Sequence, residues 1–451
     1  MVYAAANFAN PSGGSRSPMS PSRSAAAVLC SGVLLLAACQ PAQQAAPTSP
    51  PPAAATTAPA AAKPTTAASP AAAASPASAA SPAAAASPGA AASPAAAKPS
   101  AVASPAASPV AGAGGQPAAA GAPSAGCPNQ PAAAGAKKLR VGLVTDVGKI
   151  DDKSFNQSAW EGVQCAQTNL GADVRFIETT DPKDYAKNID QFAQDNYDVI
   201  VTVGFALGDD TISEANKYSN IKFIGVDQFQ AETVPNLAGL TFDEDKAGYL
   251  AGYLAGSLTK SGIVGQVLGT PIVPPVEKYG LGYINGAKAA KSGVNVLSAC
   301  HPGGLARGFT DPEWGKDTVN QEMNQNADVI FAAGGQTGNG GLLAIVDKGG
   351  AVLGIGVDTD QYQSLPEAKG ILVSSAMKLI TPGVFNIVKA VQDGSFKGGN
   401  VVGDVGLAPY HDLDSKVPAD VKSKMTQVTA DVVAGRTKTG WTAPTSNCPQ
   451  G

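Results

Sequence analysis

The sequence predicts an α/β protein with two similar parallel-sheet domains. Three observations support this fold class. From about residue 139 onwards, short apolar runs alternate with longer segments of helical spacing, which is the pattern of successive βαβ units. The series ends near residue 241 and starts again near residue 263. The folded part, roughly 137–412, has about 275 residues, which suits two domains better than one.

The first series begins with the apolar run 141–144, which is typical of a buried parallel strand. A polar loop with Asp151 and Asp152 follows, and Asp152 or Ser154 can cap a helix over 154–169. Further strands are expected at 173–177, 198–203, 222–226 and 238–241, with helices at 184–195 and 209–217.

A long helix is expected over 245–258, where leucines recur at helical spacing. The second series then predicts strands at 263–268, 294–297, 328–332 and 352–357, with helices at 276–291, 313–326 and 339–348. The strand 371–376 and the helix 382–393 could return to the first domain. We therefore predict lobe 1 at 137–241 and 371–395, lobe 2 at 242–370 and 396–412, and a helical or extended tail at 413–451.

The N-terminus has the pattern of an export signal. Arg16 and Arg23 precede an apolar run over 25–38, which is too short for a membrane span, and LAAC at 36–39 resembles a bacterial lipobox. We predict a signal peptide over 1–38 and lipidation at Cys39, which would hold the protein on the extracytoplasmic side of the cell membrane. An ordinary signal peptide with a coincidental cysteine is the alternative, and Met19 could be the true start.

The segment 40–126 consists mostly of Ala, Pro, Ser, Thr and Gly, and its only charges are Lys63 and Lys98. It has too few large side chains to offset the entropy lost on ordering. We predict a disordered tether over 39–136. O-glycosylation is compatible with the Ser/Thr-Pro composition but is not indicated by it.

Six cysteines are present. Cys30 would leave with the signal peptide and Cys39 would carry the lipid. The other four, Cys127, Cys165, Cys300 and Cys448, are an even number in an exported protein, which makes disulfides plausible, and three pairings are possible. A clasp between Cys127 and Cys448 across the folded part is attractive. Free buried thiols at Cys165 and Cys300 are the alternative.

The overall composition argues against two classes of function. The formal net charge of -4 gives no sign of a nucleic-acid surface. With two histidines and no Cys-x-x-Cys, the chain lacks the usual ligands of a zinc site. We expect neither a metal nor a cofactor.

Polar and aromatic side chains follow the predicted strand ends, where ligands bind in α/β sheets. They suit a neutral polar ligand with hydroxyl groups and a flat ring, because carboxylates accept hydroxyl hydrogens, lysine donates and phenylalanine stacks. The residues are Asp146, Gly204, Phe205 and Asp227 in the first domain, and Gly334, Gly335, Asp358, Asp360 and Lys378 in the second part.

Several motifs have a simpler interpretation. The glycine-rich turn 333–341 could bind phosphate, but it lacks the Gly-Lys-Ser/Thr ending of a Walker A loop, so a close backbone approach to the ligand is favoured. Ser154 has no nearby His, and Cys300 and His301 are consecutive, which is poor geometry for a nucleophile and its base. His411 is most simply a surface residue.

Other candidates could be structural. One residue of the Asp151–Asp152 pair is expected to cap the following helix. Phe205 and Phe331 could belong to the core, and Lys378 could be a solvated lysine. Phe155 is a large ring in the first helical turn beside a carboxylate-rich loop, where a core residue is poorly placed.

The chain resembles the basic membrane protein family of ABC-transporter substrate-binding lipoproteins, which includes purine nucleoside receptors. The resemblance covers about 139–412. It rests on VTDVGKIDDKSFNQSAWEG at 144–162, VTVGF at 201–205, AAGGQTG at 332–338, GVDTDQ at 356–361 and SAMK at 375–378. It implies a two-lobed periplasmic-binding-protein type I fold with a three-crossing hinge.

The resemblance also implies roles for individual residues. Phe155 would stack on a nucleobase, Asp227 would meet the base edge, and Asp358 with Lys378 would take the ribose hydroxyls. Phe331 would be a second stacking ring, and Asp152 departs from the purine-binding pattern. The complete predicted ligand site is Asp146, Asp152, Ser154, Phe155, Gly204, Phe205, Asp227, Phe331, Gly335, Gly338, Asp358 and Lys378.

The leading hypothesis is a lipid-anchored solute-binding protein that captures nucleosides, preferably purine ones, for an ABC permease and its ATPase subunits. The same fold could instead bind riboflavin or another small polar ligand. A nucleoside hydrolase and a surface antigen or adhesin are the alternatives from other classes, and the absence of an activated nucleophile in the sequence argues against the enzyme.

Overall fold

The structure is a computed structural model that describes residues 125–451. The predicted signal peptide, the lipidation site Cys39 and the tether up to residue 124 lie outside the described residues. Among the helices at 125–451, none combines the length and the apolar character that crossing a membrane requires.

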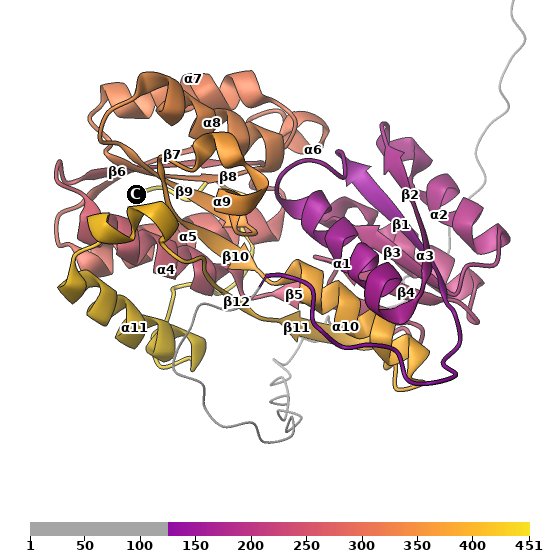
Figure 1. Ribbon diagram of the computed structural model, residues 1–451. Helices are drawn as coiled ribbons and strands as arrows, with labels where there is room; N and C mark the ends of the chain where they lie inside the picture. Colours follow the sequence, from indigo (N-terminus) through magenta and orange to yellow (C-terminus); the bar gives the residue numbers. More distant parts are fainter. Residues whose placement is uncertain (1–124) are drawn as a thin grey trace, which may run out of the picture. The chain divides into compact units, whose positions relative to one another are not determined.

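Two six-stranded sheets form the framework, and both repeat the same strand order (Figure 1). The first has the order β11-β5-β4-β3-β1-β2 and the second β12-β10-β9-β8-β6-β7. Neighbouring strands are parallel except for β12, which is antiparallel to β10. The first sheet contains β1 (Arg140–Val147), β2 (Asp173–Thr179), β3 (Val199–Val203), β4 (Lys222–Val226), β5 (Leu237–Phe242) and β11 (Gly399–Gly403). The second contains β6 (Ile263–Leu268), β7 (Asn295–Cys300), β8 (Val329–Ala333), β9 (Leu353–Asp358), β10 (Leu372–Lys378) and β12 (Val405–Leu407).

Each sheet is covered by helices on both faces, because the buried strands are apolar on both sides. The first sheet and its helices form lobe 1, which has α1 (Phe155–Leu170), α2 (Tyr185–Gln194), α3 (Gly208–Lys217) and α10 (Ile380–Gln392). The second sheet forms lobe 2 with α4 (Glu244–Leu258), α5 (Pro274–Ala290), α6 (Gly304–Arg307), α7 (Pro312–Asn324), α8 (Gly335–Lys348), α9 (Gln361–Ser364) and α11 (Ala419–Val433). Short 3-10 turns lie at Pro182–Asp184, Phe205–Leu207, Pro366–Ala368 and His411–Lys416.

Helices α4 and α5 pack with their backbones in close approach. A Cβ atom at Gly252 would overlap the carbonyl of Tyr283, and one at Gly286 would overlap the carbonyl of Tyr249. Glycine at these positions therefore fixes how closely α5 lies to α4. The spacing matters for the site because the first turns of α5 line the cavity described below.

The domain boundaries predicted after residue 370 are wrong in two places. The strand predicted at 371–376 was assigned to lobe 1, but β10 pairs with β9 and β12 in the second sheet. The residues after 396 were assigned to lobe 2, but β11 pairs with β5 in the first sheet. An apolar run reports that a strand is buried and does not report which sheet it joins. The chain passes between the sheets after β5, after β10 and after β11.

The disulfides also differ from the favoured clasp. Cys127 is bonded to Cys165 of α1, and Cys300 at the end of β7 is bonded to Cys448. Each lobe therefore carries one disulfide of its own. The predicted tether is correspondingly too long, because the stretch from Cys127 to residue 136 is held against lobe 1, where Ala132 N–H donates to Asn169 O at 3.0 Å.

The C-terminal strap, residues 437–451, runs along lobe 2. The carboxylate of Glu277 in α5 accepts the backbone N–H groups of Thr445 and Ser446 at 2.9 and 3.1 Å. Ser298 Oγ of β7 donates to Pro449 O at 2.6 Å. The strap thus joins α5 to the outer strand of the second sheet.

Candidate functional site

The two lobes place equivalent carboxylates at equivalent strand ends. Asp227 follows β4 and Asp358 ends β9, and each comes directly after a Gly-Val pair. Both have a left-handed backbone, with φ of 60° and 64°, which aspartate tolerates better than most residues. Both are buried. The two chain reversals therefore turn both carboxylates inward at the junction of the lobes.

Lys378, the last residue of β10, lies between these carboxylates. Its Nζ is 2.5 Å from Asp227 Oδ2, 3.6 Å from Asp358 Oδ1 and 3.8 Å from Glu244 Oε1. The ammonium also lies 4.6 Å from the centroid of the Phe155 ring, within range of a cation–π interaction. We refer to Lys378, Asp227, Asp358 and Glu244 as the Lys378 cluster.

Burial and mutual repulsion change the pKa values of the cluster. Burial, together with the charge on Asp227, raises the pKa of Glu244 to about 7 against the opposing effect of Lys378. Burial also raises the pKa of Asp358, which the nearby ammonium partly opposes. For Lys378, burial favours the neutral amine, but the three carboxylates outweigh it and raise the pKa above its ordinary value. The lysine is therefore a fixed cation, and Glu244 can hold a proton near neutral pH.

The loop between β1 and α1 completes the lobe 1 side. The Asp152 carboxylate accepts the backbone N–H groups of Ser154, Asn156 and Gln157 at 2.9 to 3.1 Å, so it caps α1. Burial raises the pKa of Asp152 to about 6, although these three bonds lower it. Ser154 Oγ donates to Asp358 Oδ2 at 2.7 Å and so reaches across to lobe 2.

A cavity of about 880 Å³, including its open mouth, lies beside the Lys378 cluster. Residues of both lobes form its wall, and half of them have apolar or aromatic side chains. The lining residues are Asp146, Val147, Gly148, Lys149, Asp152, Phe155, Asn156, Tyr185, Gly204, Phe205, Ala206, Asp227, Val273, Pro275, Val276, Tyr279, Leu305, Phe309, Thr310, Ala333, Gly334, Gly335, Gln336, Val357, Asp358 and Lys378.

Asp146 is the acidic group on the lobe 1 wall. Its carboxylate accepts from Asn156 Nδ2 at 3.4 Å and lies so close to Gly204 that a Cβ atom there would overlap it. Burial raises the pKa of Asp146 to about 7, although the bond from Asn156 lowers it. Near neutral pH this side chain can therefore accept or donate a hydrogen bond to a bound molecule.

The structure brings most of the predicted site residues to the cavity wall. Those that line it are Asp146, Asp152, Phe155, Gly204, Phe205, Asp227, Gly335, Asp358 and Lys378. Ser154 is not in the wall and touches the site only through Asp358.

Two predicted residues lie elsewhere. Phe331 is fully buried in the core of lobe 2, where it stacks on Tyr283 with ring centroids 5.3 Å apart. It lies in the middle of β8, whose alternate side chains face the core, so the proposed second ring position is wrong. Gly338 is inside α8 and packs against the Ala332 carbonyl rather than the cavity.

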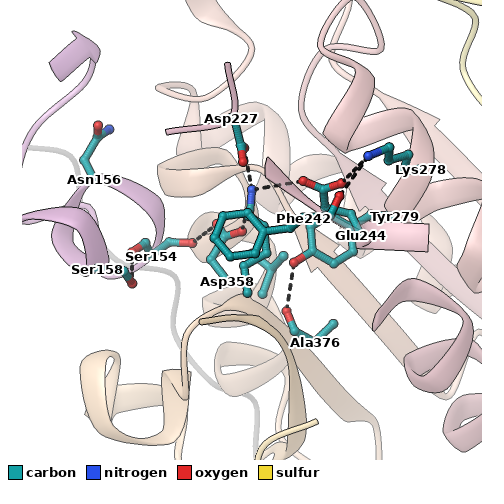
Figure 2. Close-up of polar contacts among 12 residues, drawn as sticks. Ser154, Asn156, Ser158, Asp227, Phe242, Glu244, Lys278, Tyr279, Asp358 and Ala376 are labelled. Carbon is teal, nitrogen blue, oxygen red and sulfur yellow. Dashed lines mark hydrogen bonds and ion pairs between the residues drawn. The ribbon is translucent and has the colours of Figure 1, made fainter. Parts of the chain in front are cut away.

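Several wall residues were missed from the sequence. Tyr279 lies on α5, where its spacing is that of a core residue, and its hydroxyl donates to Ala376 O at 3.2 Å (Figure 2). Leu305 lies in the short helix α6 and Phe309 just after it, in a segment after β7 whose sequence has no distinctive pattern. Only the prediction that every strand end borders the cleft could have pointed to this segment.

The cysteine and histidine residues that were considered as catalytic candidates are not arranged for catalysis. Cys300 is bonded to Cys448 and has no free thiol. His411 is half-buried rather than a free surface residue, and its Nε2 lies 2.8 Å from Asp360 Oδ2, away from the cavity. Among residues 125–451, no group of three potential ligands could hold a metal ion.

Comparison with known proteins shows which family and which relatives the chain resembles. The family model for PnrA-like ABC transporter substrate-binding proteins, Bmp, matches residues 139–407. The chain is 29% identical over 323 residues to the ABC transporter nucleoside-binding protein BmpA of Lactococcus lactis, covering 66% of this chain and 88% of that protein. It is 32% identical over 293 residues to an uncharacterised lipoprotein of Pyrococcus abyssi, covering 62% of this chain and 70% of that protein.

Solved structures share the fold. An ABC transporter solute-binding protein from Aeropyrum pernix superposes with a TM-score of 0.59 at 23% identity, covering 66% of this chain and 92% of that chain. A solute-binding protein from Conexibacter woesei gives a TM-score of 0.53 at 23% identity, covering 66% of this chain and 98% of that chain. The predicted α/β fold of periplasmic-binding type is thereby confirmed.

Proposed function

Because this chain belongs to the Bmp family of PnrA-like ABC transporter substrate-binding proteins, we propose that its cavity captures nucleosides, preferably purine nucleosides. The family is one of binding proteins and not of enzymes. The proposed ligand follows the nucleoside-binding relative of Lactococcus lactis. The observation that carries the proposal is the Lys378 cluster beside an aromatic wall, because a nucleoside presents hydroxyl groups at one end and a flat ring at the other.

The sugar end of the ligand is expected at the Lys378 cluster. Asp358 can accept two hydroxyl hydrogens, and Lys378 has N–H groups that can donate to sugar oxygens. Both side chains are almost fully buried and held in place by Asp227 and Ser154. A ligand without these hydroxyl groups would leave buried charged groups poorly paired, so it should be rejected strongly.

The base is expected against the aromatic wall. Phe155 from lobe 1 and Phe309 from lobe 2 both line the cavity, and each offers a face or edge for stacking. Asp146 and Asn156 lie on the same wall and supply polar atoms that could read a base edge. A purine offers more stacking area than a pyrimidine, which is the physical reason for the proposed preference.

Cys39 and the segment before residue 125 complete the proposal. A lipid on Cys39 would anchor the chain in the cell membrane and leave the two lobes on the extracytoplasmic side. The loaded protein would then deliver its ligand to an ABC permease and its ATPase subunits. Labelling with a radioactive fatty acid, compared between the wild type and Cys39→Ala, tests the anchor directly.

A melting-temperature panel tests the ligand. Inosine and guanosine are expected to raise the melting temperature by several degrees, since saturation at 100 times Kd adds about 2.7 kcal/mol. Hypoxanthine and uridine should raise it less. The proposal fails if no nucleoside shifts melting, and mass spectrometry of the molecule that copurifies would then show whether a larger flat ligand such as riboflavin occupies the cavity.

A further inference from the structure

Three side chains of lobe 2 hold two successive carbonyl groups of the lobe 1 loop between β1 and α1. Asn339 Nδ2 donates to Asp152 O at 2.7 Å. Ser364 Oγ and Gln361 Nε2 donate to Lys153 O at 2.7 and 3.2 Å. These bonds join residues 187 to 211 positions apart in the sequence and cross from one lobe to the other.

These donors are oriented by their own lobe. Gln361 Oε1 accepts the Val357 N–H of β9 at 3.0 Å, and its Nε2 also donates to Asn339 Oδ1 at 2.8 Å. Both polar ends of the Gln361 amide are therefore used, and its orientation is fixed before it meets Lys153 O. Gln361 and Asn339 are almost fully buried, so the bonds form away from competing water.

The accepting loop is shaped for the same contact. Lys153 has a left-handed backbone with φ of 61°, which is unusual for a residue other than glycine. The adjacent Asp152 carboxylate accepts the backbone N–H groups of Ser154, Asn156 and Gln157 and so holds the turn that presents Phe155 to the cavity. Hydrogen bonds to the carbonyl groups of Asp152 and Lys153 therefore also hold the turn that positions the Phe155 ring.

We propose that Asn339, Gln361 and Ser364 form an interlobe latch that holds the lobes together over the ligand without touching it. None of the three lines the cavity. Their contribution is to the closed arrangement, because each bond exists only when the loop at 152–153 and the helices α8 and α9 are in contact. The latch slows ligand release, while the cavity residues determine which ligand is bound.

A glutamine of lobe 1 occupies a similar place without forming such a latch. Gln228 is one residue after Asp227 and Gln361 is three residues after Asp358, and a Cβ atom at Gly225 or Gly356 would overlap the respective Gln side chain. Yet Gln228 Nε2 donates to Thr202 O and Gly204 O of its own lobe, at 3.3 and 3.0 Å. Only the lobe 2 glutamine crosses the junction.

The test removes the two outer donors of the latch in the full chain. We compare Ser364→Ala, Asn339→Ala and the double variant with Ser364→Thr, which keeps the hydroxyl group. Ser298→Ala is the matched control, since it removes a serine-to-carbonyl bond of 2.6 Å that lies within lobe 2. Stopped-flow release and association of inosine are measured together with amide hydrogen exchange of the free protein at 151–157 and 361–365.

The latch predicts several-fold faster inosine release for each single variant, about tenfold or more for the double variant, and association rates within about twofold of wild type. Exchange should rise at both segments in the free double variant. Ser364→Thr and Ser298→Ala should release inosine at the wild-type rate. Folded variants with unchanged release and unchanged exchange would overturn the latch.

The inference rests on the proposed function only through the choice of inosine as the probe. If inosine does not bind the wild type, the proposed ligand is wrong, and hydrogen exchange of the free protein decides the latch alone. Faster exchange at both segments in the double variant, but not in Ser298→Ala, supports it. Equal exchange in both proteins contradicts it.

Discussion

Lobe 1 and lobe 2 use the same strand-end sequence for different tasks. Each lobe has a Gly-Val-Asp sequence at a strand end, with Asp227 in lobe 1 and Asp358 in lobe 2, and the two aspartates have nearly the same φ angle. Asp227 forms the close ion pair with Lys378 across the junction, whereas Asp358 is farther from Lys378 and accepts Ser154 Oγ. A repeated fold unit therefore supplies two carboxylates with different partners: Asp227 pairs closely with Lys378, and Asp358 is the one that we propose receives the hydroxyl groups of a ligand.

The rest of the junction has the same asymmetry. The polar side chains after Asp227 stay within lobe 1, whereas Asn339, Gln361 and Ser364 of lobe 2 reach across to the carbonyl groups of residues 152 and 153. Lobe 2 also carries the C-terminal strap, which is tied to α5 and β7. Lobe 2 therefore supplies the side-chain donors of the proposed latch, and lobe 1 supplies the carbonyl groups that accept them.

Removal of the disulfide of each lobe should give the largest difference in stability and binding between the two lobes. Cys300–Cys448 closes a loop of 148 residues and Cys127–Cys165 one of 38. On chain-entropy grounds their loss should cost about 5 and about 4 kcal/mol of unfolding free energy. Double Cys→Ser variants and urea denaturation measure both. Only loss of Cys300–Cys448 should also weaken inosine binding, since the cavity segment with Leu305 and Phe309 begins at that bond. Equal effects on binding would contradict this asymmetry.

Lys378→Met tests how far both lobes depend on one cation. It leaves Asp227, Asp358 and Glu244 without their shared ammonium, so we expect a loss of about 3–5 kcal/mol at pH 8. The loss should be smaller at pH 5, where Glu244 and Asp358, whose pKa values are raised, are more protonated. Urea denaturation at the two pH values measures it. An equal loss at both would mean that the carboxylates are not repelling one another.

Phe331→Ala and Phe155→Ala separate the core from the cavity wall. Phe331→Ala should cost about 3–5 kcal/mol of stability because it opens a hole beside Tyr283. Phe155→Ala should cost little stability and lower inosine affinity about tenfold, on the order of 1.4 kcal/mol. Thermal unfolding and calorimetric titration distinguish the two. A large loss of stability with unchanged inosine affinity in Phe155→Ala would mean that this ring belongs to the core.

Glu322→Gln tests a buried acid that lacks a side-chain partner. Glu322 lies in lobe 2 without a side-chain hydrogen bond, and burial raises its pKa to about 8, although the backbone N–H of Gln266 lowers it. A raised pKa means that its contribution to stability is fully present below about pH 4.5 and is lost as the pH rises through about 8. At pH 9 the free energy of unfolding of Glu322→Gln, measured by urea denaturation, should therefore exceed that of the wild type by about 1 kcal/mol or more. At pH 4.5 the two free energies should be nearly equal. A stability gain at low pH only would contradict the assignment.

The sequence predicts features that depend on neighbouring residues better than features that depend on residues far apart in the chain. The strand ends at Asp146, Asp227 and Asp358 are local patterns, so the predicted carboxylates reach the cavity wall. The prediction for Phe331 was wrong because the sequence pattern places it at a strand end, whereas it lies in the middle of β8 with its ring in the core. The sheet that β10 joins, the partners of Cys127 and Cys448, and the cavity side chains on α5 depend on long-range packing that no local spacing encodes.

Calorimetric titration of inosine and hypoxanthine into the wild type, Asp358→Asn and Asp227→Asn tests the central claim most directly. Asparagine keeps the shape and tolerates the left-handed backbone. We expect the wild type to bind inosine at least about tenfold more tightly than hypoxanthine, and Asp358→Asn to lose about 10- to 100-fold in inosine affinity but little in hypoxanthine affinity. Asp227→Asn should lose stability first, because it removes the close partner of Lys378. Equal binding of nucleoside and base by the wild type, unchanged in Asp358→Asn, would contradict the account.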